Sequence, residues 1–298
     1  MLKRTIYIGS PSYLSLRNRQ LKVKDATSQE EKGSIPIEDI AMLLLDHPQI
    51  TLTSTLLDML MVHTVAVINC DAKHLPNGLM LPLQGHSTLT QRWHCQIGAS
   101  IPLKKQLWKQ TVQAKIENQR QLLLINDLPA GSMQTYLQTV TSGDETNREG
   151  IAAQYYWKHL FENFTRNPDG GYPNPLLNYG YAILRALVAR ALVSSGLLPA
   201  LGIFHHNKYN PYCLADDIME PYRPFVDLMV RELTQNSPLQ TTQLTKEVKA
   251  YLLGITTIDV TIEEQKRPLM VALSTTTASL YACYEGSKRR ISYPTLHG

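Results

Sequence analysis

The hydrophobic pattern of this chain changes its period once, and that change limits the possible folds more than any other feature. Up to about residue 75, apolar residues alternate with polar ones in short runs. Leu14 and Leu16 precede the turn-forming residues 17–19, and Leu21 and Val23 follow them. Alternation of this kind, interrupted by a turn, is typical of half-buried strands joined in a hairpin.

From Thr90 onward, apolar residues recur at helical spacing in long windows, such as residues 91–125 and 179–195. Between the two regions lies a segment rich in Pro, Gly and Asn, which favour turns. The sequence therefore predicts an α+β fold in three parts: a small β-rich domain over 1–75, a linker over 76–89 and a larger all-α domain over 90–298.

One apolar segment, Tyr181 to Phe204, is long enough to suggest a membrane span. Arg185 and Arg190 lie in its middle, where each would cost several kcal/mol in lipid, and Gly196 with Pro199 interrupts it. We expect a buried helix and no membrane. The first residues lack the apolar core of a secretory signal, and the four widely spaced cysteines fit neither a zinc motif nor a disulfide framework, so we expect a cytoplasmic protein.

The net charge of +4 is small for 298 residues, and residues 1–76 contribute none of it, since their eight Lys and Arg balance eight Asp and Glu. A polyanion would therefore have to bind a local patch. The candidate patch is a basic stretch that could track a phosphate backbone, with two interleaved indoles, Trp93 and Trp108, that could pack against ribose or bases. The alternative is ordinary solvated helix surface. The basic residues are Arg92, Lys104, Lys105, Lys109, Lys115 and Arg120.

Several catalytic motifs are absent from the sequence, namely GxxxxGK[ST], GxGxxG after a strand, GxSxG and HExxH. Nucleotide hydrolysis and dinucleotide redox chemistry thus lack their signatures. The side chains that remain for chemistry are acids and one histidine pair in the helical part.

The densest such cluster runs from His205 and His206 to Glu220. If residues 214–220 are helical, Asp217 and Glu220 project to one side. Two acids and an imidazole suit Mg²⁺ or Mn²⁺, and only one of two adjacent histidines can face a metal. The alternative is structural: Asp216 or Asp217 caps a helix, and the histidines are polar loop residues.

A second candidate is Glu149, which falls on the same helical face as Ala152 and Tyr156, an apolar stripe. A carboxylate at that position needs a partner. The alternative is a capping box, since Thr146 lies three residues before Glu149 and its backbone N–H could be satisfied by the carboxylate.

Three segments resemble CRISPR-associated protein 1, the spacer-acquisition integrase of CRISPR immunity, in the form found in type II systems. They are REGIAAQYYW around Glu149, NPLLNYGYAILRA from Asn174, and GIFHHNKYNPYCLADDIMEPYRPFVD from Gly202. The last two are long and specific, and the resemblance runs nearly from end to end.

The resemblance implies a β-rich domain followed by a helical catalytic domain with a metal site. By motif position its ligands are Glu149, His205 and Glu220, with Mg²⁺ or Mn²⁺ as cofactor and Asp217 as a candidate for the second coordination shell. The implied reaction is attack of a DNA 3′-hydroxyl on a phosphodiester at the edge of a repeat, without ATP.

The resemblance also implies partners: double-stranded DNA, a second copy of the chain bound through the β-rich domain, CRISPR-associated protein 2 and, in type II loci, the RNA-guided effector nuclease. The DNA-binding candidates are Arg92, Lys104, Lys105 and Lys109. Two alternatives stay open. One is a structure-specific metal-dependent nuclease, and the other is a non-catalytic DNA-binding assembly protein.

Overall fold

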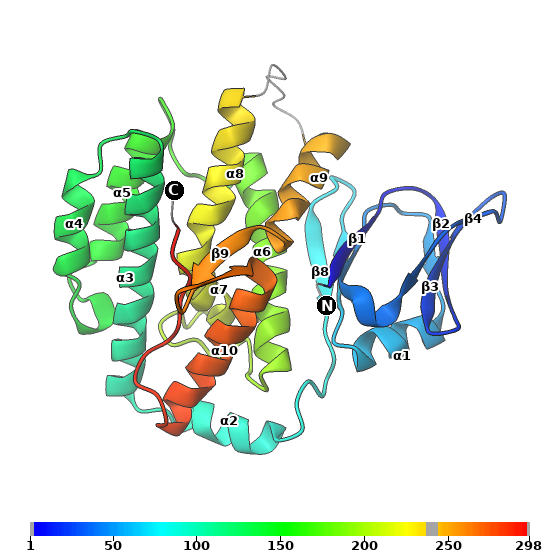
Figure 1. Ribbon diagram of the computed structural model, residues 1–298, viewed down its shortest axis with the longest axis horizontal. Coiled ribbons are helices and arrows are strands. Elements are labelled where there is room, and N and C mark those ends of the chain that lie inside the picture. Colours follow the sequence, from blue (N-terminus) through cyan, green and yellow to red (C-terminus); the bar gives the residue numbers. More distant parts are fainter. Residues whose placement is uncertain (1–2, 237–243, 297–298) are drawn as a thin grey trace. The chain divides into compact units, whose positions relative to one another are not determined.

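The computed structural model describes residues 3–236 and 244–296, and the chain divides into two compact units, 1–87 and 88–298. The first is β-rich and the second is mostly helical (Figure 1), which confirms the α+β class. The linker expected over 76–89 is partly wrong, because Pro76–Met80 forms a strand, β8, that pairs with β7. Asn77 and Gly78, two of the residues that suggested a linker, lie within this strand.

The first unit contains two four-stranded sheets and one helix, α1 (Ser54–Val62). One sheet has the order β4-β3-β2-β6 and the other β1-β5-β7-β8. The strands are β1 (Arg4–Ile8), β2 (Ser12–Arg17), β3 (Gln20–Asp25), β4 (Glu31–Pro36), β5 (Ile40–Leu45), β6 (Ile50–Leu52), β7 (Ala66–Cys70) and β8, with a 3-10 turn η1 (Ile37–Asp39).

The predicted hairpin is present as β2 and β3, which pair antiparallel around Asn18 and Arg19, both with positive φ. Two consecutive left-handed residues form the turn that matches the twist of the strands. The six residues of β5 are all buried because β5 pairs in parallel with β1 on one side and β7 on the other. Ile8 of β1 belongs to the buried core of this unit, and Ile6 packs against it.

The second unit is built from nine α-helices within the described residues, together with three 3-10 turns and one β-hairpin. The helices are α2 (Leu89–Ile97), α3 (Ile101–Ile125), α4 (Gly131–Gln138), α5 (Arg148–Leu160), α6 (Asn174–Ser194), α7 (Cys213–Met219), α8 (Arg223–Asn236), α9 (Lys246–Leu253) and α10 (Leu269–Glu285). The turns are η2 (Ser142–Asp144), η3 (Glu220–Tyr222) and η4 (Gly254–Thr256), and the hairpin is β9 (Asp259–Ile262) with β10 (Gln265–Pro268).

Helix α6 is the core helix of this unit and contacts α7, α8, α9 and α10. It is long and apolar enough to cross a membrane, but 72% of its apolar window is buried inside the protein, as expected for a core helix. Arg185 pairs with Asp216 of α7 rather than facing an apolar medium. Gly180 lets α8 approach closely, since a Cβ there would lie 2.4 Å from Val226.

The β9–β10 hairpin is an element that the sequence pattern did not predict. Its two-residue turn consists of Glu263 and Glu264, both with positive φ. Glycine and asparagine usually occupy such positions, so the turn has no composition signal.

Candidate active site

Glu149 lies in the first turn of α5 and is not used as a helix cap. The N-cap is Asn147, whose side chain accepts the N–H of Gly150. The carboxylate of Asp144 accepts the N–H groups of Arg148 (2.8 Å) and Glu149 (2.9 Å). The capping-box alternative is therefore wrong, because other side chains already satisfy the helix end and the Glu149 carboxylate is directed elsewhere.

Glu220 begins η3, directly after α7, and is buried. One of its oxygens lies 2.5 Å from Nζ of Lys115 and the other 2.9 Å from Nε of Arg223. Burial opposes ionisation of this carboxyl group, but the charges of Arg223 and Lys115 outweigh it and lower its pKa to about 2. Glu220 is thus an anion held among cations.

Lys115, from the middle of α3, joins the two glutamates. Its ammonium group contacts the carboxylates of both Glu149 and Glu220, and the residue is only 7% exposed. Burial opposes the charge of Lys115, but Glu220 and Glu149 more than compensate and raise its pKa. Two oxygens that contact one nitrogen lie within about 6 Å of each other, twice an ordinary N–O hydrogen-bond length. Glu149 and Glu220, which are 71 positions apart in the sequence, thus meet at the ammonium group of Lys115.

His205 lies in the loop between α6 and α7 and is held by Asp217, which is fully buried on α7. The Asp217 carboxylate accepts the backbone N–H groups of Ile203, Phe204 and His205, and its Oδ1 lies 2.5 Å from Nδ1 of His205. An ionised carboxylate is an acceptor only, so Nδ1 carries the proton and Nε2 is the nitrogen that could ligate a metal. The same hydrogen bond raises the pKa of His205.

A glycine and an aromatic stack hold the His205 loop against Asp217. A Cβ on Gly202 would lie 2.8 Å from the Asp217 carboxylate and 2.4 Å from the carbonyl of His205, so the loop can close on Asp217 only with glycine there. Trp108 stacks on Phe204 with ring centroids 4.3 Å apart, and both rings meet the His205 imidazole edge-on. His206 is exposed on the same loop.

Asp216, the neighbour of Asp217, has a structural role. It forms an ion pair with Arg185 of α6 through both carboxylate oxygens and accepts a hydrogen bond from Asn210. The alternative in which Asp216 or Asp217 caps a helix is wrong, because both follow the N-cap position, Tyr212, by several residues.

The side chains of Glu149, Glu220 and His205 are of the types that bind a divalent cation. In this structure they are not arranged around one point as the ligands of a metal ion are. Over residues 3–236 and 244–296, no three His, Cys, Asp or Glu side chains are close enough to hold a metal ion. The two carboxylates and the imidazole nevertheless supply the oxygen and nitrogen ligands that Mg²⁺ and Mn²⁺ take. Lys115 lies at the point on which both carboxylates converge, so its ammonium group occupies the place that a cation would need.

The basic stretch divides into parts with different roles. Arg92 donates to the carbonyl of Ser195 and lies over the Tyr281 ring, which are internal contacts of the unit. Lys105 pairs with Glu145 at the surface. The idea that the Trp108 indole packs against nucleic acid is wrong, since it is 2% exposed and stacks on Phe204.

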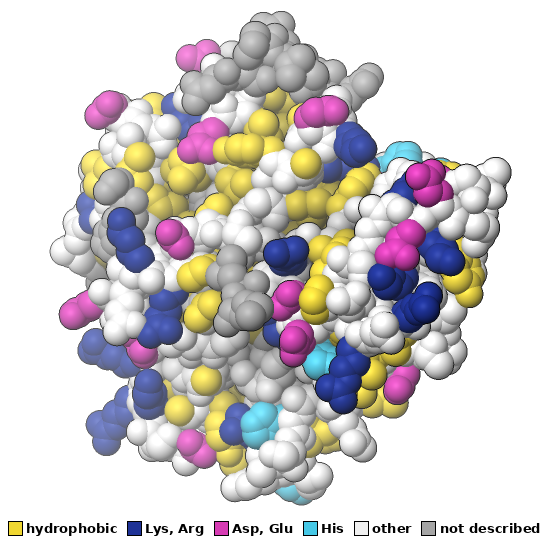
Figure 2. All heavy atoms as spheres, turned by 45° about the vertical axis from the view of Figure 1, so that its right-hand side comes forward, with side chains coloured by type: hydrophobic (Ala, Val, Ile, Leu, Met, Phe, Trp, Pro, Cys, Tyr) yellow, Lys and Arg dark blue, Asp and Glu magenta, His cyan; other side chains and the backbone are white. Residues whose placement is uncertain are grey.

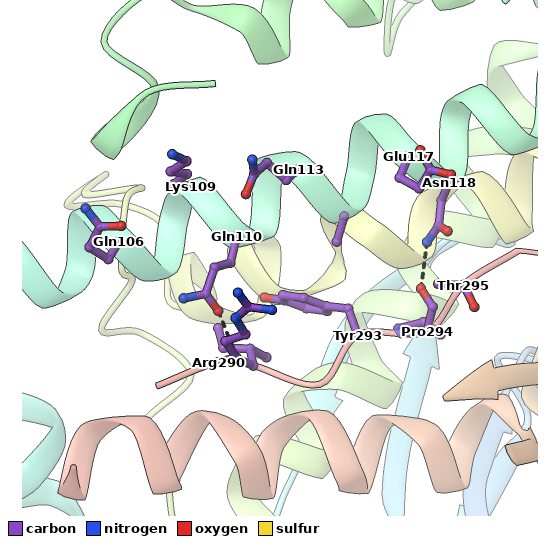
Figure 3. Close-up of a pocket in the computed structure, with 12 residues that line it drawn as sticks. Gln106, Lys109, Gln110, Gln113, Glu117, Asn118, Arg290, Tyr293, Pro294 and Thr295 are labelled. Atoms are coloured by element: carbon purple, nitrogen blue, oxygen red, sulfur yellow. Dashed lines mark hydrogen bonds between the residues drawn. The ribbon is translucent and has the colours of Figure 1, made fainter. Parts of the chain in front are cut away.

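Lys109 lines a polar groove of about 530 Å³ between α3 and the C-terminal segment. Figure 3 shows side chains of successive α3 turns on one side of this groove and Arg290, Tyr293 and Thr295 on the other. Gln110 connects the two sides, because its side chain donates to the carbonyl of Arg289 and accepts from the backbone N–H of Ile291. Arg290 and Lys109 therefore line the same groove.

The fold, a β-rich unit followed by a mostly helical unit, is shared by solved structures of low sequence identity. A casposase bound to its integration product matches 98% of this chain and 92% of its own, with a TM-score of 0.79 and 20% identity. A Cas6-RT-Cas1–Cas2 complex matches 96% of this chain and 35% of its own, with a TM-score of 0.74 and 21% identity. These likenesses show the fold.

Sequence comparison then gives the family. The model of the CRISPR associated protein Cas1 family matches residues 6–267, and the CRISPR-associated endonuclease Cas1 of Neisseria meningitidis serogroup C is 39% identical over 285 residues, 95% of this chain and 92% of the relative. The chain belongs to the Cas1 family, which supports a nuclease or integrase role.

Proposed function

We propose that this protein is a metal-dependent integrase that inserts spacer DNA into a CRISPR array, in the form found in type II systems. The observation that carries the proposal is the convergence of the Glu149 and Glu220 carboxylates on the buried ammonium group of Lys115. His205, whose Nδ1 is held by Asp217, interacts electrostatically with Glu220. Together these side chains could supply two oxygens and one nitrogen to a single Mg²⁺ or Mn²⁺ ion.

Glu149, His205 and Glu220 would hold the cation. When bound, the metal would polarise the non-bridging phosphate oxygens and stabilise the charge that develops there in transesterification. Asp217 would keep Nε2 of His205 unprotonated and directed at the site. The attacking group would be a DNA 3′-hydroxyl, so no side chain is required as a nucleophile.

The DNA backbone would contact a patch on α3, namely Lys104, Lys105 and Lys109, with Arg290 added across the groove. On the face in Figure 2, Lys and Arg side chains lie in local groups at the lower left and at the right, with acids and uncharged groups among them. A local patch of this kind fits the small net charge. Arg92 would contribute less, since its guanidinium group already makes internal contacts.

The β-rich unit would serve assembly as a homodimer, since four strands, β1, β8, β4 and β6, end its two sheets and could pair with another chain. CRISPR-associated protein 2 and the type II effector nuclease are the further partners that we propose, in the cytoplasm.

A strand-transfer assay tests the proposed reaction. Labelled DNA with a free 3′-hydroxyl is incubated with a repeat-containing duplex, Mn²⁺ and either the unmodified protein or Glu220→Gln. Joined products that require both Mn²⁺ and Glu220 would support the integrase. Cleavage without joining would favour a structure-specific nuclease, and binding without either product would favour a non-catalytic assembly protein.

A further inference from the structure

Lys115 is the one cation on α3 that the structure places inside the candidate site. It is buried, and its ammonium group contacts both Glu149 and Glu220, with the Glu220 oxygen at 2.5 Å. Two carboxylates brought this close would repel each other without a cation between them. Lys115 supplies that cation from within the chain.

Within the cluster of ion pairs that Lys115 forms part of, the charges are already balanced. The negative groups are Glu149 and Glu220, and the positive groups in contact with them are Lys115 and Arg223. A divalent cation added to this set would leave an excess of positive charge in a buried site, where Coulomb interactions are weakly screened. Binding of the metal therefore requires that the ammonium group move away from the carboxylates.

Lysine suits such an exchange because its charge is a compact point on a flexible four-carbon stem, whereas a bidentate guanidinium group is held more rigidly. We propose that Lys115 is a built-in counter-ion that keeps Glu149 and Glu220 together when no metal is bound and competes with the divalent cation for them. Lys115 thus sets the metal concentration at which the site fills. This inference rests on the metal site of the proposed function.

Calorimetric titration with Mn²⁺ tests the competition. Lys115→Met removes the competing charge and keeps a side chain of similar length, so we expect about tenfold tighter Mn²⁺ binding than in the unmodified protein. Without metal the same variant should melt at a lower temperature, because the two carboxylates then face each other without the ammonium group between them, and Mn²⁺ should raise its melting temperature more. Lys158→Met, an exposed lysine on α5, is the matched control and should bind Mn²⁺ as the unmodified protein does.

The outcomes separate the two claims. Mn²⁺ binding that depends on Glu220 but is unchanged or weakened in Lys115→Met overturns the counter-ion role and leaves the metal site standing. Absence of Mn²⁺ binding in the unmodified protein and in Lys115→Met overturns both.

A measurement on the unmodified protein covers the case in which Lys115→Met does not fold. The ¹⁵N signal of a buried, ion-paired ammonium group can be followed by NMR and assigned by its loss in Lys115→Arg. We expect Mg²⁺ to shift or broaden the Lys115 signal and to leave that of Lys158 in place. An unchanged Lys115 signal at saturating Mg²⁺ would overturn the proposal.

Discussion

His205 and Asp217 are joined through Nδ1 and Oδ1 over 2.5 Å, and the same carboxylate also accepts three backbone N–H groups of the loop that carries the histidine. Asp217 thus fixes both the position of the loop and the tautomer of the ring. In metal sites, a carboxylate that binds the free ring nitrogen of a histidine ligand orients that ligand in the same way.

Asp217→Asn should lower strand transfer about 10- to 100-fold, the usual cost of losing a carboxylate that orients a histidine ligand. The amide NH₂ can donate to Nδ1, which would place the ring proton on Nε2 and block it as a ligand. Strand transfer is measured at saturating Mn²⁺, with melting temperature as a check on folding. The control is Asp216→Asn, which weakens the pair with Arg185 and leaves His205 in place. Equal loss of strand transfer in both variants would contradict the role given to Asp217.

His205→Ala should abolish strand transfer while DNA binding persists, because the proposed metal ligand and the basic patch are different residues. His206→Ala should have a much smaller effect, since His205 is the histidine that Asp217 holds. Strand transfer and filter binding on the same preparations provide the comparison. Similar losses of joining in the two variants would mean that the wrong histidine was chosen.

Replacing Lys104 and Lys109 together by alanine should make DNA binding less dependent on salt. Removal of one phosphate interaction reduces the slope of log K against log salt by about 0.9 for duplex DNA, so we expect a reduction of about 1 to 2. Arg92→Ala should instead lower the melting temperature, because Arg92 contacts Ser195 and Tyr281. An unchanged slope in the double variant would assign these lysines to ordinary solvated surface.

Asp227 should make stability depend on pH. Burial raises the pKa of its carboxyl to about 6, although hydrogen bonds from Tyr181 and Tyr156 oppose the shift. The folded state therefore binds this proton more tightly than the unfolded state, so the contribution of Asp227 to stability falls as pH rises from about 4 to 6 and is constant above. The fall amounts to about 3 kcal/mol, at about 1.4 kcal/mol per pKa unit.

Urea unfolding of the unmodified protein and of Asp227→Asn at several pH values isolates this contribution. As the pH rises from about 4 to about 6, the free energy of unfolding of Asp227→Asn should increase relative to that of the unmodified protein. Parallel curves over this range would show that Asp227 keeps an ordinary pKa.

The division into a β-rich and a helical part could be predicted because it depends on local periodicity, which the sequence carries directly. The β2–β3 hairpin was predictable for the same reason. Strand β8 and the β9–β10 hairpin were not, because β8 contains Pro76 and Gly78, and two glutamates form the hairpin turn. In both cases tertiary pairing prevails over local propensity.

The candidate site could be predicted from motifs, but the cations around it could not. Nothing in the local sequence separates Lys115 from the other lysines of α3, and only the packing of α5 and η3 against α3 shows that it points inward. Trp108 is similar: its indole suggested a surface for nucleic acid, and the fold places it beneath Phe204. Which face of a long helix is buried is decided by neighbours remote in sequence.

The central claim is that Glu149, His205 and Glu220 share one metal ion, and anomalous diffraction from a crystal soaked in Mn²⁺ tests it most directly. The account predicts a peak about 2.0 to 2.6 Å from an oxygen of each glutamate and from Nε2 of His205, with the ammonium group of Lys115 withdrawn from the carboxylates. A peak at other side chains, or ligand atoms of these three residues more than about 8 Å apart in the Mn²⁺-soaked crystal, well beyond two metal–ligand bonds, would contradict it.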